Sequence, residues 1–355
     1  MESVIYYLWL SLKAGTSTSE FCELLEEYGS SEDIYNMNFD SDNILSDKDL
    51  TYAQKEYDKC CEEKVCIVSY TDEIYPQSLR EIDNPPLVLY CKGNVSLLKR
   101  PLLSVAGTKN CSNDGKNYAR RFAKSVYENN IVPVTPFSPG IEAEVCKSVD
   151  EVIVIMPCGI DKTYPAKQFS LKNKIIKDGG LVITEQPLGM GAIAHNIVSR
   201  NRLIAAISLY SLIIQAHKES NTGIIFDFCQ RYGRGCFVIP GDITNPYYEG
   251  CNSFIKRGGI LVTEPQDIIN FYRLIYPDVV TEHKETEVNI VSHKIENDRT
   301  NPSEKAIIDA LNISKLNYDE LVEKSGLSAS EAASAVTMLE MLGIIENTGG
   351  VFSVK

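Results

Sequence analysis

The chain has 355 residues, of which 44% are hydrophobic and 23% are charged. This composition excludes a disordered or collagen-like chain, and the length predicts two or three folded units. The four histidines are scattered and the eleven cysteines show no paired Cys-x-x-Cys spacing, so we expect no metal site. An odd number of cysteines spread through apolar stretches is typical of reduced thiols, which predicts a cytoplasmic protein.

Charge is divided unevenly along the chain. The net charge is -13, but residues 71–280 hold 23 Lys and Arg against 20 Asp and Glu, whereas residues 1–70 hold 5 against 15. Because phosphate attraction needs positive charge, any anionic ligand is expected in the middle segment. The first apolar stretch, Val4–Leu12, is too short to span a bilayer and follows an acidic residue. It predicts a buried helix and no membrane span.

The first segment shows helical periodicity. Ile5, Leu8 and Leu12 recur at helical spacing, and further apolar residues continue the pattern up to Tyr28. Glycine, serine and a polar stretch then interrupt it. We predict a small helical domain over residues 1–65, similar to a SAM or helix-hairpin-helix domain.

The middle segment contains short, unalternated apolar runs separated by helix-length intervals. Such runs are typical of strands in a parallel sheet that is covered on both faces. We therefore predict a doubly wound, Rossmann-like α/β domain over residues 66–280. The runs begin at Cys66, Leu87, Leu102, Ile131, Val152, Leu181, Leu212, Cys236 and Ile260.

The last segment returns to helical patterns after a linker. Residues 281–301 mix charged residues and asparagine with few apolar residues, which indicates the linker. Three helices followed by a strand, a turn and a strand predict a winged helix over residues 302–355. We expect the helices at 306–311, 318–325 and 329–342, and the strands at 343–346 and 349–352.

Ligands of an open parallel sheet bind at the carboxyl ends of its strands, where loops lead into helix N-termini. The loop after the strand at 102–105 contains Gly107, Thr108, Lys109 and Ser112. The glycine permits close backbone approach, the lysine supplies charge and the serine can cap the next helix. An ordinary strand-to-helix turn with a cap would carry the same residues, so this loop alone leaves both interpretations open.

Two arginines lie in the run Ser199–Arg202, at the predicted start of an apolar helix. The helix dipole disfavours arginine there unless it meets an anion. We expect one arginine to pair with Glu185 or Glu142, which leaves the other to bind phosphate. Residues 220–223 are small and include two hydroxyl groups, as in anion-binding loops. The candidate binding residues of these later segments are Arg200, Asn201, Arg202, Ser220, Thr222, Gly223, Asn252 and Lys256.

The chain lacks the standard catalytic motifs. It has no Gly-x-Gly-x-x-Gly dinucleotide loop, no Gly-x-x-x-x-Gly-Lys-[Ser/Thr] phosphate loop, no His-Glu-x-x-His and no Gly-x-Ser-x-Gly. This disfavours an enzyme that works by those devices, and we expect neither a catalytic residue nor a cofactor.

Several short motifs follow one another between residues 65 and 275. They are Tyr75-Pro76-x-x-Leu79, Pro85-Pro86-Leu87, Gly107-Thr108-Lys109, Gly159-Ile160-Asp161, Gly180 with Glu185, Arg200-Asn201-Arg202, Pro240-Gly241 and Gly250-x-Asn252. Each motif is weak alone. By their shared order and spacing, the chain resembles the DNA-processing protein A (DprA/Smf) family.

The resemblance implies a non-enzymatic protein that binds and protects incoming single-stranded DNA and loads the recombinase RecA during natural transformation or DNA uptake. It also implies a homodimer and, as a further partner, a single-stranded DNA-binding protein. The candidate residues named above would hold the strand, together with Lys167, which lies one place beyond a basic position of relatives. The apolar-aromatic segment 267–276 is expected either to form the dimer contact or to cover the sheet's own edge.

The chain departs from the family pattern within these loops. Where the family resembles Ser-Gly-x-Ala-x-Gly-Ile-Asp, residues 135–142 carry two prolines, which remove N–H donors and fix φ. Lys109 replaces an arginine and supplies a point charge instead of a bidentate fork. Ala194 and Ile197 replace a basic residue and a stacking phenylalanine. These changes predict weakened DNA binding.

Two alternatives stay open. A nucleotide-binding or phosphoribohydrolase-like enzyme has a related fold, but it would need a Pro-Gly-Gly-x-Gly-Thr-like loop that the chain lacks after Asn221. The other is a degenerate paralogue that acts as a protein-interaction module. Residues 328–342, which would enter a DNA groove, contain Glu331 and Glu340 but no Lys or Arg, so the winged helix is expected to contact protein or to serve only as a stable cap.

Overall fold

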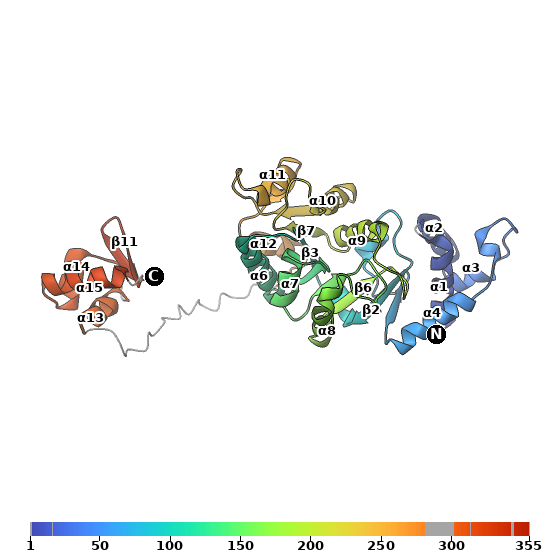
Figure 1. Cartoon of the computed structure of the whole chain (residues 1–355), viewed down its shortest axis with the longest axis horizontal. Coiled ribbons are helices and arrows are strands. Elements are labelled where there is room, and N and C mark those ends of the chain that lie inside the picture. Colours follow the sequence, from blue (N-terminus) through green and yellow to red (C-terminus); the bar gives the residue numbers. More distant parts are fainter. Residues whose placement is uncertain (1, 16, 281–301, 313, 342–343, 355) are drawn as a thin grey trace. The chain divides into compact units, whose positions relative to one another are not determined.

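The structure is a computed structural model that describes residues 2–15, 17–280, 302–312, 314–341 and 344–354. The chain divides into two compact units, Met1–Glu282 and His283–Lys355, and each is described by itself (Figure 1). The predicted linker, 281–301, lies outside the described residues. Among the described helices, none combines the length and the apolar character that crossing a membrane would require.

The first unit begins with helices that pack on one edge of a sheet. Leu8, Trp9 and Leu10 of the first helix are almost fully buried, because this helix contacts other helices and also two strands, β1 (Cys66–Ser69) and β2 (Val88–Gly93). The N-terminal segment is thus helical, as its periodicity predicts, but it belongs to the same compact unit as the sheet. A separate helical domain over residues 1–65 stays a prediction. The helices of this segment are α1 (Glu2–Ala14), α2 (Ser19–Tyr28), α3 (Ser31–Asn36) and α4 (Thr51–Glu62), with a 3-10 turn, η1 (Ile44–Ser46).

The sheet of this unit has nine strands in the described residues, in the order β1-β2-β6-β5-β4-β3-β7-β8-β9. Strands β3 to β9 pair in parallel, as the apolar runs predict, whereas β1 pairs antiparallel with β2, and β2 pairs antiparallel with β6. The remaining strands are β3 (Leu102–Ala106), β4 (Val132–Pro136), β5 (Ile153–Ile155), β6 (Leu181–Thr184), β7 (Tyr210–Ile213), β8 (Gly235–Val238) and β9 (Ile260–Leu261).

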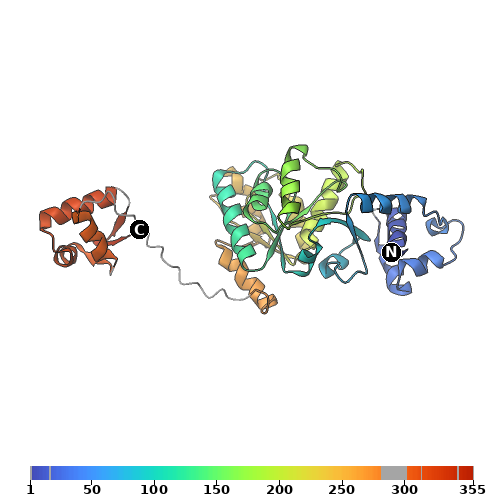
Figure 2. The same ribbon diagram turned by 90° about the horizontal axis from the view of Figure 1, so that it is seen from below.

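Helices cover both faces of this sheet (Figures 1 and 2). The central strands are therefore apolar on both sides, and Leu103, Val134 and Leu212 are completely buried. The helices are α5 (Gln77–Arg80), α6 (Asn113–Glu128), α7 (Ile141–Ser148), α8 (Phe169–Lys177), α9 (Ala194–Ala206), α10 (Thr222–Arg231), α11 (Glu249–Lys256) and α12 (Pro265–Ile275), with 3-10 turns η2 (Val95–Lys99), η3 (Ala166–Gln168) and η4 (Pro246–Tyr248).

The chain reverses its direction of winding between β3 and β7. From β3 it proceeds to β4, β5 and β6 on one side, whereas β7, β8 and β9 lie on the other side. The loops that follow β3 and β7 consequently separate at the carboxyl end of the sheet. Such a switch point is where open α/β sheets bind their ligands.

The second unit is the expected winged helix, with its own apolar core around Leu321, Leu339 and Phe352. One expectation is wrong: the second wing strand does not begin at Gly349. Gly349 and Gly350 have φ of 64° and 87° and form the turn, which moves both strands two residues onward. The elements are α13 (Pro302–Leu311), β10 (Leu316–Asn317), α14 (Tyr318–Ser325), α15 (Ala329–Met341), β11 (Ile345–Thr348) and β12 (Val351–Val354).

Candidate functional site

A cavity of about 430 Å³ lies at the switch point, and we call it the switch-point cavity. Its lining comes from the loops after β3, β4 and β7 and from α9, so segments more than 100 residues apart meet there. Of the predicted site residues, it gathers Gly107, Thr108, Lys109, Arg200, Asn201, Ser220 and Thr222. It also gathers Asn110, Pro136, Ser138, Pro139, Glu142, Tyr164, Pro165, Ile197, His217, Glu219, Asn221 and Ile225.

The loop after β3 is held against two neighbouring loops. The Thr108 N–H donates to the carbonyl oxygen of Gln215 at 2.9 Å. A Cβ atom at Gly107 would lie 2.5 Å from the Ile141 side chain, and one at Gly140, where φ is 88°, would lie 2.4 Å from the carbonyl oxygens of residues 108 and 109. Both glycines are therefore required by close packing, and Lys109 is left exposed at the cavity rim.

Ser112 caps a helix instead of facing the cavity. Its hydroxyl oxygen accepts from the Gly115 N–H at 3.0 Å and from the Gln215 amide Nε2 at 2.7 Å. The Ser112 N–H in turn donates to Oε1 of Gln215 at 3.0 Å. Gln215 thus ties the loop after β7 to the start of α6 with a neutral side chain.

The two predicted arginines have separate environments. Helix α9 begins at Ala194, so the expectation that they open the helix is wrong, and the helix dipole does not act on them as supposed. Positions two apart on a helix point in different directions. Arg200 lines the switch-point cavity, whereas Arg202 lines a second cavity of about 550 Å³, near the end of β6 and Asn84.

Arg202 is the structural arginine. Its Nη2 donates to Glu185 at 2.5 Å and its Nη1 donates to the carbonyl oxygen of Asn84 at 2.8 Å. Both charged side chains are nearly buried, with 15% of Arg202 and 13% of Glu185 exposed. Glu185 also accepts from the Ser199 hydroxyl. The expected pairing with Glu185 is therefore present for one arginine.

Arg200 is more deeply buried and only partly neutralised. Its Nε and Nη2 donate to Oδ1 of Asn201 at 3.3 and 2.9 Å. Burial lowers the pKa of Arg200 to about 10, against the attraction of Glu142. Burial likewise raises the pKa of Glu142 to about 7, although the Gly107 N–H and the Arg200 charge act in the opposite direction. The cavity floor thus carries a buried cation and a buried acid.

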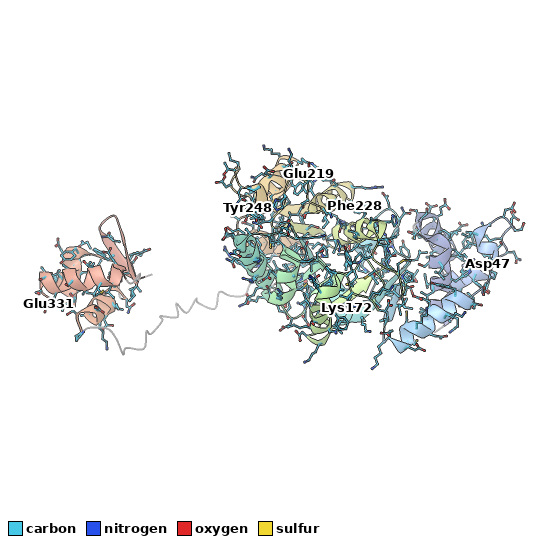
Figure 3. The ribbon with its side chains drawn as sticks, viewed as in Figure 1. Asp47, Lys172, Glu219, Phe228, Tyr248 and Glu331 are labelled. Carbon is cyan, nitrogen blue, oxygen red and sulfur yellow. The ribbon has the colours of Figure 1, made fainter. Side chains whose placement is uncertain are left out.

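The loop after β7 leads into α10 through a serine turn. The Ser220 hydroxyl oxygen accepts from the Thr222 N–H at 3.0 Å, and the Ser220 carbonyl oxygen accepts from the Gly223 N–H at 2.9 Å. Ser220 and Thr222 line the cavity, whereas Gly223 lies outside its lining, close to the Phe254 ring. Glu219, which Figure 3 labels, belongs to the same loop and adds a carboxylate to the lining of the cavity.

The other predicted residues lie outside the cavity lining. The Asn252 side chain bonds the backbone of Gly241, accepting at 3.3 Å and donating at 3.0 Å. Lys256 ends α11 and Lys167 lies in η3, and both are exposed. Lys167 nevertheless follows Tyr164 and Pro165, which do line the cavity.

Sequence reasoning missed several lining residues. His217, whose Nε2 lies 3.2 Å from the carbonyl oxygen of Asn110, is in the loop after β7, so its position after a strand was a usable signal. Tyr164 lies three residues after the Gly159-Ile160-Asp161 motif but was not predicted as a site residue. Glu142 was considered only as a partner for arginine. Its burial, at 4% exposure, depends on tertiary packing.

Comparisons with known proteins agree with this architecture. A family model described as DNA recombination-mediator protein A matches residues 66–273, more than half of the chain, and a model described as the DprA winged helix domain matches residues 296–350. The DNA processing protein DprA of Streptococcus pneumoniae is 27% identical over 292 residues, which cover 76% of this chain and 98% of that protein.

Solved structures show the same likeness. The X-ray structure of DNA processing protein A from Streptococcus pneumoniae aligns with a TM-score of 0.63 at 26% identity, covering 75% of this chain and 97% of that one. DNA processing protein A from Helicobacter pylori, described for its single-stranded DNA binding mode, aligns with a TM-score of 0.55 at 24% identity, covering 59% and 97%. The second likeness shows a shared fold.

Proposed function

This chain belongs to the DNA recombination-mediator protein A family, and we propose that it binds single-stranded DNA and loads the recombinase RecA on it during natural transformation or DNA uptake. The observation that supports this most directly is the switch-point cavity. It joins the buried Arg200, the exposed Lys109 and the hydroxyl groups of Ser220 and Thr222. Cations and hydroxyl donors at strand ends are the groups that hold phosphates.

The single DNA strand would lie along the rim of the switch-point cavity and reach into it. Lys109 and the Ser220 loop would contact phosphates, and Arg200 would supply the buried positive charge. The exposed rings of Tyr164 and Phe169, 39% and 59% accessible, would stack on bases. Lys167 and Lys256 would extend the path beyond the cavity. The Helicobacter pylori relative, which binds single-stranded DNA, supports this use of the fold.

The binding experiment compares a single-stranded oligonucleotide, its duplex and a free nucleotide over a range of salt concentrations. We expect tightest binding to the single strand, with an affinity that falls steeply with salt because several phosphates are contacted. Binding that does not depend on salt, or that favours the duplex, would contradict the proposal.

RecA loading is tested separately. RecA filaments are assembled on single strands coated with single-stranded DNA-binding protein, with and without this chain, and filament growth is followed by the ATPase of RecA. We expect faster nucleation with this chain present. Unchanged nucleation would limit the function to DNA binding. The proposed partners and the cysteine pattern, which is typical of reduced thiols, support a cytoplasmic location.

Helix α12 would form a homodimer contact. Its inner face is buried at Ile268 and Tyr272, and the Tyr272 hydroxyl donates to the carbonyl oxygen of Leu102 at 2.6 Å. This face covers the sheet. The outer face leaves Phe271, Leu274 and Ile275 exposed, at 38%, 83% and 38%. Apolar side chains exposed together on one helix favour a self-complementary contact.

An enzymatic alternative is tested in the same preparation. Glu142, an acid with a pKa of about 7 in a cavity, is the feature that favours it, because a general acid works best near such a value. Nucleotides and oligonucleotides are incubated with the chain and released bases are measured. Release that disappears in Glu142→Gln would establish a nucleotide-cleaving activity.

A further inference from the structure

One oxygen of Glu142 has no hydrogen-bond donor. The side chain is 4% exposed and lines the switch-point cavity. Its Oε1 accepts from the Gly107 N–H at 3.2 Å, whereas its Oε2 is buried and accepts no hydrogen bond in the structure. A buried carboxylate oxygen without a donor is costly. Its position in a cavity lining suggests that a ligand supplies the donor.

The nearest buried cation does not satisfy this oxygen. Arg200 and Glu142 are both described, and no ion pair links them; the guanidinium bonds Asn201 instead. The cavity thus contains a buried acceptor, the Glu142 carboxylate, and a buried group with N–H donors, the Arg200 guanidinium. The two groups make no hydrogen bond to each other. A phosphate would meet repulsion from the carboxylate, so the ligand group between the two must carry donors as well as acceptors.

The walls around this pair suit a flat ring. Pro136, Pro139 and Ile197 present apolar surface, and Tyr164 presents a half-exposed aromatic ring. A volume of about 430 Å³ falls in the range of small-molecule sites. A nucleobase has the required shape, and bases of single strands are recognised by stacking and by hydrogen bonds to their edges.

The order of donors and acceptors distinguishes the bases. Guanine presents two neighbouring donors, N1–H and N2–H, beside the O6 acceptor, which matches a carboxylate beside a guanidinium. Thymine presents one N–H between two carbonyl oxygens, which would face the carboxylate. Cytosine and adenine each present one amino group beside an acceptor nitrogen. Guanine therefore makes the most hydrogen bonds and the fewest repulsive contacts here.

We propose that the switch-point cavity binds a guanine base, with Glu142 accepting from N1–H and N2–H and Arg200 donating to O6. Where the guanine belongs to a DNA strand, this rests on the proposed function, with the phosphates held at the rim by Lys109 and Ser220. A free guanine nucleotide would present the same edge. Glu142 then makes the cavity selective for one base, while Lys109 and Ser220 at the rim bind phosphate.

The experiment measures Kd by fluorescence anisotropy at pH 8 with the full chain. The probes are a 12-nucleotide oligo-dT and the same oligonucleotide with one central dG, dA or dC. Because a bidentate base contact contributes about 1–3 kcal/mol of discrimination, the dG probe should bind at least about fivefold more tightly than oligo-dT. In Glu142→Gln this preference should fall below about twofold, since the amide replaces one acceptor with a donor.

Two further variants serve as controls for the role of the Glu142 carboxylate. Glu142→Asp keeps the carboxylate but shortens the reach, so it should weaken the preference without removing the charge. Glu219→Gln removes a rim carboxylate of the same cavity, so it should raise the affinity for all four probes through charge alone and keep the dG preference. A thermal melt confirms that each variant is folded.

Separate arms distinguish failure of this proposal from failure of the proposed function. If all four probes bind with the expected salt dependence and equal affinity, guanine recognition is wrong and DNA binding stands. If no probe binds, calorimetry with GMP and TMP decides: GMP binding that is lost in Glu142→Gln supports the site with a free nucleotide as its ligand. Absence of GMP binding as well overturns both.

Discussion

The guanidinium of Arg202 lies 2.5 Å from a carboxylate oxygen of Glu185, in a nearly buried ion pair that joins α9 to the end of β6. Removal of one member leaves the other charge buried without a partner. We expect Arg202→Ala to lower the free energy of unfolding by about 3 kcal/mol, measured by urea denaturation. A loss below about 1 kcal/mol, the usual value for exposed pairs, would show that the pair is solvated in solution.

Arg200→Ala should behave differently. The burial cost that lowers the pKa of Arg200 partly offsets the loss of its bonds to the Asn201 oxygen. We therefore expect the free energy of unfolding to fall by about 1–2 kcal/mol, less than in Arg202→Ala. The affinity for single-stranded DNA should fall about tenfold or more, because a charged contact to a buried group is lost. Unchanged affinity in a folded variant would remove Arg200 from the proposed site.

Lys109 should contribute charge alone. It is exposed at the cavity rim, so Lys109→Ala is expected to leave the melting temperature unchanged. The slope of log Kd against log salt concentration should fall by about 0.7, the value for one phosphate contact in a single strand. Lys99→Ala is a matched control, because Lys99 pairs with Glu73 on an exposed surface outside the cavity lining. Its slope should equal that of the unaltered protein.

The buried acid predicts a pH dependence of stability. Because burial raises the pKa of Glu142 to about 7 from an ordinary 4.5, the folded state binds its proton more tightly than the unfolded state. The stabilisation is complete below about pH 4.5 and is lost as pH rises through 7. Glu142→Gln lacks this loss, so its stability relative to the unaltered protein should increase from pH 5 to pH 8, by on the order of 3 kcal/mol. A difference that is constant with pH would mean that the carboxyl group is hydrated.

The dimer is tested on the outer face of α12. Leu274 is 83% exposed, so Leu274→Glu should not disturb the core, but it would place a charge in an apolar contact. We expect sedimentation velocity to show a dimer for the full chain and a monomer for this variant, with equal melting temperatures extrapolated to low concentration. Asn270→Glu, on the same helix and also exposed, is the control for added charge. A dimer that survives Leu274→Glu would place the contact elsewhere.

The strands were predictable because burial on both faces leaves continuous apolar runs, such as Val152–Ile155, that few other structures require. The start of α9 was not predictable. Its N-cap residue is Ile193, which makes no side-chain cap, so the polar residue that usually marks a helix start is missing. The sequence therefore predicts the arginines at the start of the helix, whereas they lie more than one turn after it.

The site was predictable only in part, for a related reason. Residues in the loops that follow strands, such as Lys109 and Ser220, can be predicted from the topology. The burial of Glu142 and the choice between two faces of α9 depend on which side chains meet across the sheet, and a single sequence carries no signal for that. The sequence predicts that one of the two arginines pairs with a carboxylate, because an arginine near buried apolar residues needs one. It does not indicate that Arg202 is the arginine that pairs with Glu185.

The bond from the Thr108 N–H to the carbonyl oxygen of Gln215 also has a kinetic consequence. The two residues follow the neighbouring strands β3 and β7 but are separated by about half of the α/β domain along the chain, so their contact closes a long loop. A ribosome must therefore deliver the chain beyond β7 before the cavity can exist. Strands β4 to β6 can fold earlier as a nascent half-sheet, and translation that stops before Gln215 leaves them without the wall that completes the ligand site.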